Sequence, residues 1–368
     1  NCNIHGAFAT SIETDNMLLE TRKAFADFFG CSWEEVSFGA NSTTINFNLA
    51  GAIARDLKPG DEVVITDSEH ECNRGPWEIL EERGIIVHNV KVDIENCIID
   101  MEDYKSKLNK KTKVAAFNYA SNGVGTISDV KKMVAMAHEV GAIAIVDAVH
   151  YALHGPIDVK NLDADFLFCS AYKFFGPHVG VLYSKKEKLE ELRTLRVKEQ
   201  EDFAPYKFET GTLNHEGIAG AAEAVEFIAS IGEEYGSEFD KELAHLSGRR
   251  KNVVAGMMTL EAYEQPITEY FIDELNKIPG VKIYGPPKGY PRTSTVSFTL
   301  KNKSPKEVAE YLGEKGIFVW DGDFFASKLV RVLGLRESGG LVRVGLAPYN
   351  TLEEIDRTLE AVRELAVK

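Results

Sequence analysis

The sequence predicts an α/β fold, with a large domain around a mostly parallel sheet and a small α+β domain at the C-terminal end. Three observations predict it. Short apolar runs alternate with amphipathic stretches along most of the chain. The runs are almost continuously apolar, which is typical of strands buried on both faces. After about Gly236 this rhythm gives way to a less regular mixture of helices and strands.

The large domain is expected to contain strands at residues 62–66, 85–92, 114–118, 142–147, 165–170 and 179–183. Gly, Asp or Asn bounds most of these segments, and such residues favour turns. Helical patterns lie between them. Apolar residues recur every four positions from Ile45 to Leu57, and a second helix is expected after Ser128, its predicted N-cap. Strands that alternate with helices form parallel sheets covered on both faces.

The small domain is expected to begin with a long helix over residues 238–259. Strands at 281–284, 295–300, 317–320 and 341–344 and a helix at 305–315 follow it. A last helix opens with Thr351-Leu-Glu-Glu354, which is a capping box. We therefore expect an N-terminal segment near the active site (1–15), a large cofactor-binding domain (16–240) and a small C-terminal domain (241–368).

Charge and cysteine content narrow the class of protein. The formal net charge is -15, which argues against nucleic acid and anionic membranes as partners. No apolar run reaches the roughly 18 residues of a membrane span. The five cysteines are odd in number and form no CxxC pair, so neither a zinc site nor a disulfide framework is expected. Residues 1–5 lack signal-peptide character, and we expect a cytoplasmic protein.

Lys173 lies just after the predicted strand 165–170, among apolar and aromatic residues. Ligands of open α/β sheets bind outside the carboxyl ends of strands. Desolvation there lowers the pKa of a lysine and makes its neutral amine available for Schiff-base chemistry. The alternative is a surface lysine in a turn.

Two further segments suggest what Lys173 holds. Asp147 ends a buried strand, and a carboxylate in that place suits the pyridinium nitrogen of pyridoxal 5'-phosphate (PLP). Ser42 and Thr43 open the helix that follows Phe38, where backbone N–H groups and hydroxyls bind phosphate. Each has a plainer alternative, because an Asp also caps turns and Ser or Thr also caps helices.

With these elements in order, the sequence resembles the fold-type I PLP enzymes of the class V aminotransferase family, most closely the SufS/NifS-like cysteine desulfurase group. The resemblance covers nearly the whole chain and implies a seven-stranded-type sheet. It rests on these motifs: Asn41-Ser-Thr43, Asp67-Ser-Glu-His70 with Asn73 and Pro76-Trp77, Ala120-Ser-Asn122-Gly-Val-Gly-Thr126, Val146-Asp147, Ser170-Ala-Tyr-Lys173-Phe-Phe-Gly-Pro177, Phe208-Glu-Thr-Gly-Thr212 and Arg343-Val-Gly-Leu-Ala-Pro-Tyr-Asn350-Thr351.

The resemblance implies a role for each matching residue. Lys173 corresponds to the Schiff-base lysine, Asp147 to the pyridinium partner and His70 to the histidine that stacks on the PLP ring; His70 could instead be a loop histidine. Asn122 and His150 correspond to residues that contact the phenolic oxygen of PLP. Ser42, Thr43 and Ser170 correspond to phosphate contacts, and Thr212 to a phosphate contact from the other subunit of a dimer. Arg343 corresponds to the arginine that binds the α-carboxylate of the substrate. His5 resembles a histidine near the substrate, with a surface histidine as the alternative.

The sequence departs from the group at three places. Phe325 stands where the desulfurases carry their nucleophilic Cys, Trp320 where they have Arg, and Tyr172 where they have His. No persulfide can form at Phe325. Cys72, near His70, is the best placed substitute, ahead of Cys2 and Cys169. The aromatic residues of this region indicate either a more aromatic pocket or packing between the domains.

The resemblance therefore implies a PLP-dependent enzyme of the cysteine desulfurase or C–S lyase type, acting on L-cysteine or a related small amino acid. Transamination or epimerisation of a small amino acid is the second reading, and a non-catalytic PLP-binding protein the third. The implied partners are the amino-acid substrate, a second copy in a homodimer with composite active sites, and a sulfur-acceptor protein. Neither nucleic acid nor a membrane is expected as a partner.

Overall fold

The main sheet has seven strands in the order β1-β9-β8-β7-β6-β2-β3 in the computed structural model, which describes residues 3–368. The strands are β1 (Val36–Gly39), β2 (Glu62–Thr66), β3 (Ile86–Val90), β6 (Thr112–Asn118), β7 (Ile143–Asp147), β8 (Phe166–Ser170) and β9 (Gly180–Ser184). Neighbours from β3 to β8 pair in parallel, whereas β9 runs antiparallel to β8 and to β1. The predicted mostly parallel sheet is confirmed.

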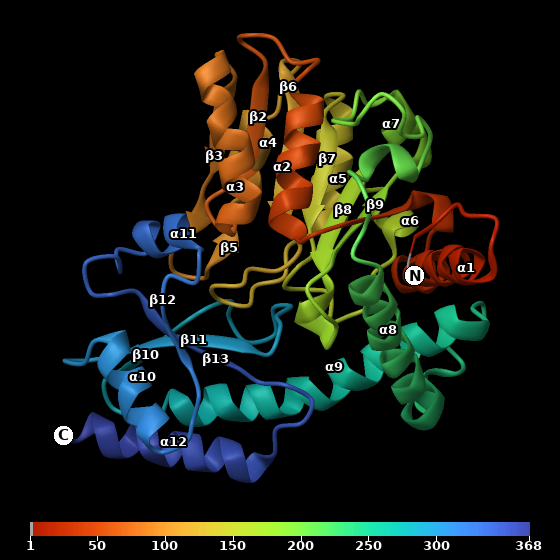
Figure 1. Ribbon diagram of the computed structural model, residues 1–368. Coiled ribbons are helices and arrows are strands. Elements are labelled where there is room, and N and C mark those ends of the chain that lie inside the picture. The colour runs from red at the N-terminus through yellow and green to blue at the C-terminus, as the bar shows by residue number, and fades with distance from the viewer. Residues whose placement is uncertain (1–2) are drawn as a thin grey trace.

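Helices cover both faces of this sheet (Figure 1). One face carries α1 (Ala9–Phe29), α4 (Met101–Lys107), α5 (Val130–Glu139), α6 (Val159–Leu162) and α8 (His215–Tyr235), and the other carries α2 (Ser42–Ile53), α3 (Glu71–Glu78) and α7 (Lys186–Glu191). Neighbouring residues of one strand enter different cores: in β6, Ala115 packs into the first and Ala116 into the second. Because both faces are buried, the strands are apolar without alternation.

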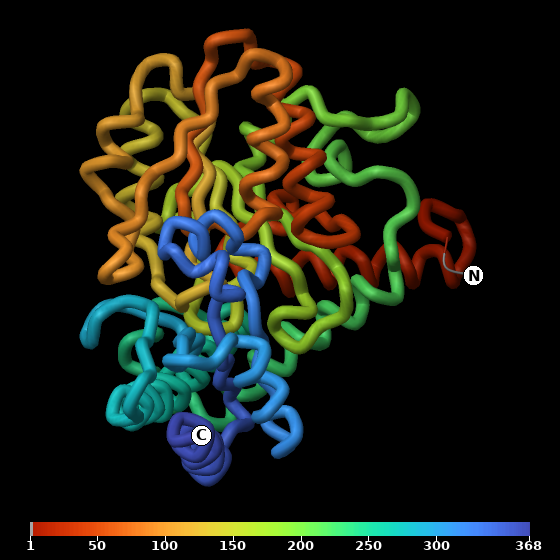
Figure 2. The backbone as a smooth tube through the Cα atoms, turned by 90° about the vertical axis from the view of Figure 1, so that its left-hand side faces the viewer, coloured from red at the N-terminus to blue at the C-terminus, as the bar shows by residue number. Residues whose placement is uncertain are grey.

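The C-terminal part has its own antiparallel sheet, in the order β10-β11-β13-β12. Most of this part lies below the main sheet in Figure 2, in teal and blue. Its elements are β10 (Val281–Tyr284), β11 (Thr295–Leu300), α10 (Pro305–Glu314), β12 (Trp320–Gly322), α11 (Ser327–Val332), β13 (Leu341–Gly345) and α12 (Leu352–Ala366). A small ribbon of β4 (Val92–Asp93) and β5 (Ile98–Ile99) lies beyond β3 in the chain. The capping box at Thr351 opens α12 as predicted.

Helix α9 (Gly248–Leu275) belongs to both halves of the molecule. Its first half packs against α8 and α1, with Val253 and Met257 in the core of the main sheet. Its second half packs against β11 and α12, with Phe271 and Leu275 in the core of the small sheet. Figure 1 shows this helix running from beneath α8 to beneath the small sheet. The two sheets are therefore joined by one continuous element.

The predicted helix over residues 238–259 has the wrong bounds. The helix begins only after Ser247, at Gly248 with a left-handed φ of 57°, and continues to Leu275. Residues 240–246 form turns, in which Leu243 packs against the helix. Pro266 lies inside the helix without ending it, because packing on both cores outweighs its poor helix propensity.

Other boundaries also differ from the prediction. Asp129 rather than Ser128 caps α5, since its carboxylate accepts from Lys132 N–H (3.3 Å), while the Ser128 hydroxyl bonds Asn118 (3.3 Å). The expected strand at 317–320 begins only at Trp320, as β12, because the Ile317 N–H bonds the Leu312 carbonyl at the end of α10 (2.9 Å). The expected strand at 85–92 is split into β3 and β4. Strand β1 was not predicted from the sequence, and α2 ends before Leu57. Within residues 3–368, no helix is both long and apolar enough to cross a bilayer.

Candidate active site

The carboxyl ends of β2, β6, β7 and β8 meet at one edge of the main sheet, facing the small sheet (Figure 1). A cavity of about 830 Å³ lies there. It is lined by Ser42, Thr43, Phe47, His70, Glu71, Cys72, Asn118, Ala120, Asn122, Asp147, Val149, His150, Tyr172, Lys173, Trp320, Asp321, Gly322, Asp323, Phe324, Phe325 and Arg343. This is where ligands of open α/β sheets bind.

Lys173 lies in a short 3₁₀ helix, η3 (Ala171–Phe174), directly after β8. The turn is held by the Gly176 N–H bond to the Ala171 carbonyl (2.9 Å), and Phe175 takes a left-handed φ of 71° within it. The Lys173 side chain is exposed to the cavity, whose walls still displace much of the surrounding water. This burial and the charge of Arg343 lower the pKa of the lysine, so its neutral amine is more accessible than usual.

Asp147 ends β7 and is almost fully buried, at 4% exposure. One oxygen accepts from Val149 N–H (2.9 Å) and the other from the Cys72 thiol (3.3 Å). Burial raises the pKa of this carboxyl to about 6, although the two hydrogen bonds and the nearby Lys173 act to lower it. Within residues 3–368 it forms no ion pair. A buried carboxylate without a cation fits the protonated ring nitrogen of PLP.

His70 is the N-cap of α3. Its Nδ1 accepts from the backbone N–H of Cys72 (2.9 Å), so the proton of the neutral ring lies on Nε2. Burial, with Lys173 and Arg343 nearby, lowers the pKa of His70 to about 4, and the ring is therefore neutral near pH 7. The cap holds its ring at the wall of the cavity, 5.6 Å from the ring of Phe325.

The start of α2 forms a corner suited to an anion. Asn41 caps the helix through Thr44 N–H (2.9 Å), and Ser42 N–H donates to the buried hydroxyl of Ser170 (3.0 Å). The close approach of α2 to β9 requires glycine at position 180, because an added Cβ would lie 2.6 Å from the Asn41 carbonyl carbon. The N-terminal end of the helix dipole and the nearby Ser42 and Thr43 hydroxyls fit a phosphate group.

Arg343 projects from β13, opposite Trp320 of β12. Its Nη1 donates to the Asn122 carbonyl (2.9 Å), and its guanidinium lies 4.5 Å from the centre of the Phe324 ring. Burial lowers the pKa of Arg343 to about 10, which leaves it charged at neutral pH. The Asn122 amide in turn donates to the Phe324 carbonyl (2.8 Å). These contacts join the small sheet to the loop after β6.

The segment 323–326, between β12 and α11, covers part of the cavity as a strained loop. Phe324 and Phe325 both adopt left-handed φ angles, 55° and 56°, which cost L-residues roughly 1–2 kcal/mol each. Glu71 anchors the loop: its N–H donates to the Phe325 carbonyl (2.7 Å), and its carboxylate accepts from the Ser327 hydroxyl. The loop therefore reaches the large domain through α3.

Not every predicted site residue lines the cavity. His150 does, but its Nε2 faces the hydroxyls of Thr293 (3.2 Å) and Thr295 (3.0 Å). Ser170 lies behind the cavity wall. His5 is exposed and bonds Asp15 through its backbone N–H (3.0 Å), away from the cavity.

Thr212 is a predicted phosphate contact, and three cysteines are candidate sulfur carriers. Thr212 is exposed in the loop before α8 and lies outside its own subunit's cavity. Cys169 is buried in β8, and burial raises the pKa of its thiol. Burial and the neighbouring Asp147 raise the pKa of the Cys72 thiol well above its usual value. Cys2 lies outside the described residues.

Phe47, Asn118 and Glu71 are among the cavity residues that the sequence did not predict. Phe47 lies one helical turn after Thr43 on α2, so helix periodicity could have placed it on the same face. Asn118 ends β6, in register with Asp147 on β7, and strand ends could have revealed it. Glu71 gave no local signal, because its partners lie about 250 residues away.

A family model described as Aminotransferase class-V matches residues 2–250 and 253–358. The chain belongs to this family. Class V enzymes depend on PLP, and the protein is accordingly a PLP-dependent, cysteine desulfurase-like enzyme with the type I fold.

Relatives and solved structures support this membership. A cysteine desulfurase of Haloferax volcanii is 31% identical, covering 98% of this chain and 82% of that protein. A probable cysteine desulfurase of Mycolicibacterium paratuberculosis is 32% identical over the whole chain, which spans 51% of that relative. The apo structure of a cysteine desulfurase from Thermococcus onnurineus matches with a TM-score of 0.86 at 28% identity, covering 99% of this chain and 88% of that one.

Proposed function

We propose that this PLP-dependent enzyme cleaves the C–S bond of L-cysteine or a related amino acid, with the cofactor held as a Schiff base on Lys173. One observation carries the proposal: the Lys173 amine, the buried Asp147 carboxylate and the Arg343 guanidinium converge on one cavity. An amine, an acid for a ring nitrogen and a carboxylate clamp are what amino-acid chemistry on this cofactor requires.

When bound, PLP supplies an electron sink for the electron pair left at the substrate Cα. The chain supplies the surroundings. Asp147 would pair with the ring nitrogen, the start of α2 would bind the phosphate, and the neutral ring of His70 would pack against the cofactor. Lys173 removes the Cα proton through Nζ, and its lowered pKa suits a base near neutral pH. Arg343 orients the substrate carboxylate.

The residues around the cavity favour elimination of the substrate sulfur over its transfer to a cysteine of the protein. The cavity wall carries Phe325 where the resemblance places a nucleophilic Cys. Cys72, the cavity-lining cysteine among residues 3–368, is buried and donates its thiol proton to Asp147. Both features oppose a persulfide carrier. For cysteine itself, elimination and hydrolysis convert one cysteine and one water into pyruvate, ammonia and hydrogen sulfide.

We also infer a homodimer with composite sites. The exposed Thr212 lies too far from its own cavity to line it, and the resemblance assigns it to the phosphate of a second subunit. A residue that serves the neighbouring site would make the dimer the active unit.

The central experiment replaces Lys173 and follows the cofactor and the products. Lys173→Ala should abolish the visible absorption of bound PLP and both sulfide and pyruvate release, whereas Lys241→Ala, at an exposed position, should change neither. Assays of the unchanged enzyme with each amino acid, with and without a 2-oxo acid, identify the reaction. New amino-acid formation with no sulfide would reject C–S cleavage in favour of transamination.

A further inference from the structure

The cavity is lined by several large, exposed aromatic side chains. Large exposed rings line it: Trp320 (69% exposed), Phe325 (68%), Phe47 (47%) and Tyr172 (41%). They come from β12, the strained loop, α2 and η3, so four separate elements direct rings to one space. Water-exposed aromatic clusters cost free energy unless a ligand covers them. Their convergence indicates that a substrate group packs among them.

The register of the small sheet brings this aromatic wall close to the bound amino acid. Trp320 pairs directly with Arg343 across β12 and β13, so the two side chains lie on one face of the sheet. Directly opposed Cβ atoms in such pairs are roughly 5 Å apart. An amino acid whose carboxylate is held by Arg343 therefore extends its side chain within reach of the Trp320 ring. The cavity of about 830 Å³ lies high in the usual range of ligand sites.

The charges left at this end of the cavity are negative. In the proposed function, Lys173 and Asp147 pair with the cofactor and Arg343 with the substrate carboxylate. The remaining ionisable carboxylates of the wall are Glu71 and Asp323; Asp321 pairs with the core residue Val342, so its side chain lies on the opposite face of the small sheet from Trp320 and Arg343. Within the described chain, neither Glu71 nor Asp323 forms a salt bridge.

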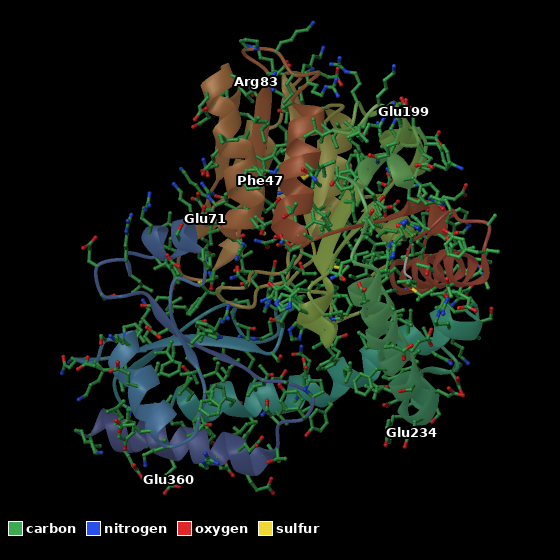
Figure 3. The ribbon with its side chains drawn as sticks, in the orientation of Figure 1. Phe47, Glu71, Arg83, Glu199, Glu234 and Glu360 are labelled. Atoms are coloured by element: carbon green, nitrogen blue, oxygen red, sulfur yellow. The ribbon has the colours of Figure 1, made fainter. Side chains whose placement is uncertain are left out.

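The hydrogen bonds of these acids leave carboxylate oxygens available. One oxygen of Asp323 accepts from Phe325 N–H (3.0 Å), and one of Glu71 accepts from Ser327. Lys328, the lysine of α11, pairs with Asp67 instead (3.8 Å). Figure 3 shows Glu71 at the end of α3 nearest the small sheet, and Phe47 on the neighbouring helix. Aromatic faces and unpaired carboxylates together attract cations.

We propose that this cavity selects an amino acid with a bulky, positively charged side chain, such as a cysteine whose sulfur carries a cationic substituent. The inference rests on the proposed function for the position of the reacting end of the substrate. The aromatic wall contacts the substituent, and Glu71 and Asp323 complement its charge. Plain L-cysteine would leave this wall uncovered.

The test compares substrates of equal length that differ in charge. The PLP-loaded enzyme should cleave S-(2-aminoethyl)-L-cysteine with a kcat/KM about tenfold above that of S-propyl-L-cysteine, and further above that of S-carboxymethyl-L-cysteine. L-Lysine is L-norleucine with an added terminal ammonium group, and neither contains a C–S bond. Their binding constants, read from the change in cofactor absorption, should show the same order without any cleavage.

Two sets of variants locate the preference. Asp323→Asn, and separately Trp320→Ala, should bring the ratio between cationic and neutral substrates close to one. Glu234→Gln with Glu360→Gln removes two negative charges from exposed positions far from the cavity, and should leave the ratio intact (Figure 3). A loss of the ratio in this control would assign it to net charge and overturn the site.

The outcomes separate the two proposals. Equal or better use of the neutral substrate, with sulfur products formed, rejects the cationic side chain but keeps C–S cleavage. Tighter binding of lysine than norleucine, with no cleavage of any conjugate, keeps the cationic side chain and rejects C–S cleavage. Preference for the carboxylate conjugate overturns the inference outright.

Discussion

Cys72 links the two residues that face the proposed cofactor. Its backbone N–H sets the tautomer of His70, and its thiol donates to Asp147. A thiol is a weak donor, so it neither neutralises the carboxylate nor competes strongly with a ring nitrogen. At 4% exposure the side chain also fills the space behind Asp147. At this scale Cys72 is a positioning residue.

The first prediction separates positioning by Cys72 from sulfur transfer. Cys72→Ala should weaken PLP binding several-fold and lower stability by about 1 kcal/mol, because a hydrogen bond and some packing are lost. Sulfide release per PLP-loaded site should remain within a few-fold of the unchanged enzyme. Cys72→Ser keeps a donor and should recover much of the PLP affinity, measured by equilibrium dialysis. Complete loss of sulfide release in fully loaded Cys72→Ala would point to a persulfide at Cys72 instead.

The second prediction concerns the buried charge of Asp147. Its folded-state pKa, raised by burial to about 6, lies above the ordinary value of 3.8. A raised acid pKa contributes stability that is complete below about pH 4 and is lost as pH rises through 6. Asp147→Asn should therefore stabilise the PLP-free protein at pH 8, by on the order of 2–3 kcal/mol, and much less at pH 4.5. Urea unfolding at both pH values checks this.

The same substitution should act in the opposite direction on function. Without a carboxylate for the ring nitrogen, PLP-dependent turnover should fall by several orders of magnitude while the protein folds well. If Asp147→Asn raised the unfolding free energy less at pH 8 than at pH 4.5, the sign of the pKa shift would be contradicted.

At the scale of elements, the phosphate corner depends on how closely α2 approaches the sheet. Strand β9 runs antiparallel to β8 and pairs Gly180 with Ser170, while the Asn41 backbone lies directly against Gly180. This approach brings Ser42 N–H onto the Ser170 hydroxyl. The geometry of the corner is thus set by strand pairing and by one missing side chain.

The third prediction tests that approach. Gly180→Ala places a Cβ 2.6 Å from the Asn41 carbonyl carbon and 2.7 Å from Ile45, so α2 must shift. We expect a loss of about 1–3 kcal/mol in unfolding free energy and a PLP affinity lowered at least tenfold. Gly313→Ala is the matched control, because this helical glycine has no atom within 4 Å of an added Cβ. It should be neutral or slightly stabilising. Equal effects of the two substitutions on PLP affinity would argue against phosphate binding at the start of α2.

At the scale of the whole molecule, α9 carries the small sheet while remaining packed on the core of the large one. Arg343 reaches Asn122, and Glu71 reaches Phe325, across the cavity between them. The substrate wall is therefore assembled from both halves of the chain. A second subunit, proposed from Thr212, would complete it.

The fourth prediction tests the composite dimer by mixing two variants. Lys173→Ala and Thr212→Arg should each be nearly inactive alone. Co-refolded in equal amounts, they form mixed dimers in which one site has both its own Lys173 and an intact Thr212 from its neighbour. Activity should then rise to about a quarter of that of the unchanged enzyme. No recovery, with mixed dimers shown by mass, would place Thr212 outside the neighbouring site.

Much of the large sheet and the positions of Lys173, Asp147 and the start of α2 could be predicted because these depend on local order. A buried strand is apolar wherever it lies, and parallel strands bring their carboxyl ends to one edge. Helix α9 shows the limit of such patterns. Its start at Gly248 and its passage through Pro266 depend on packing against two cores that lie apart in the sequence.

By itself, the sequence determined the fold class, the family resemblance and the order of the groups around the proposed cofactor. Only the tertiary structure decided which side chains touch: Cys72 with Asp147, Glu71 with the Phe325 loop, and Trp320 beside Arg343. The physical reason is chain separation. Contacts between residues 23 to 256 positions apart follow from strand register and helix packing, for which no local pattern of residues provides a signal.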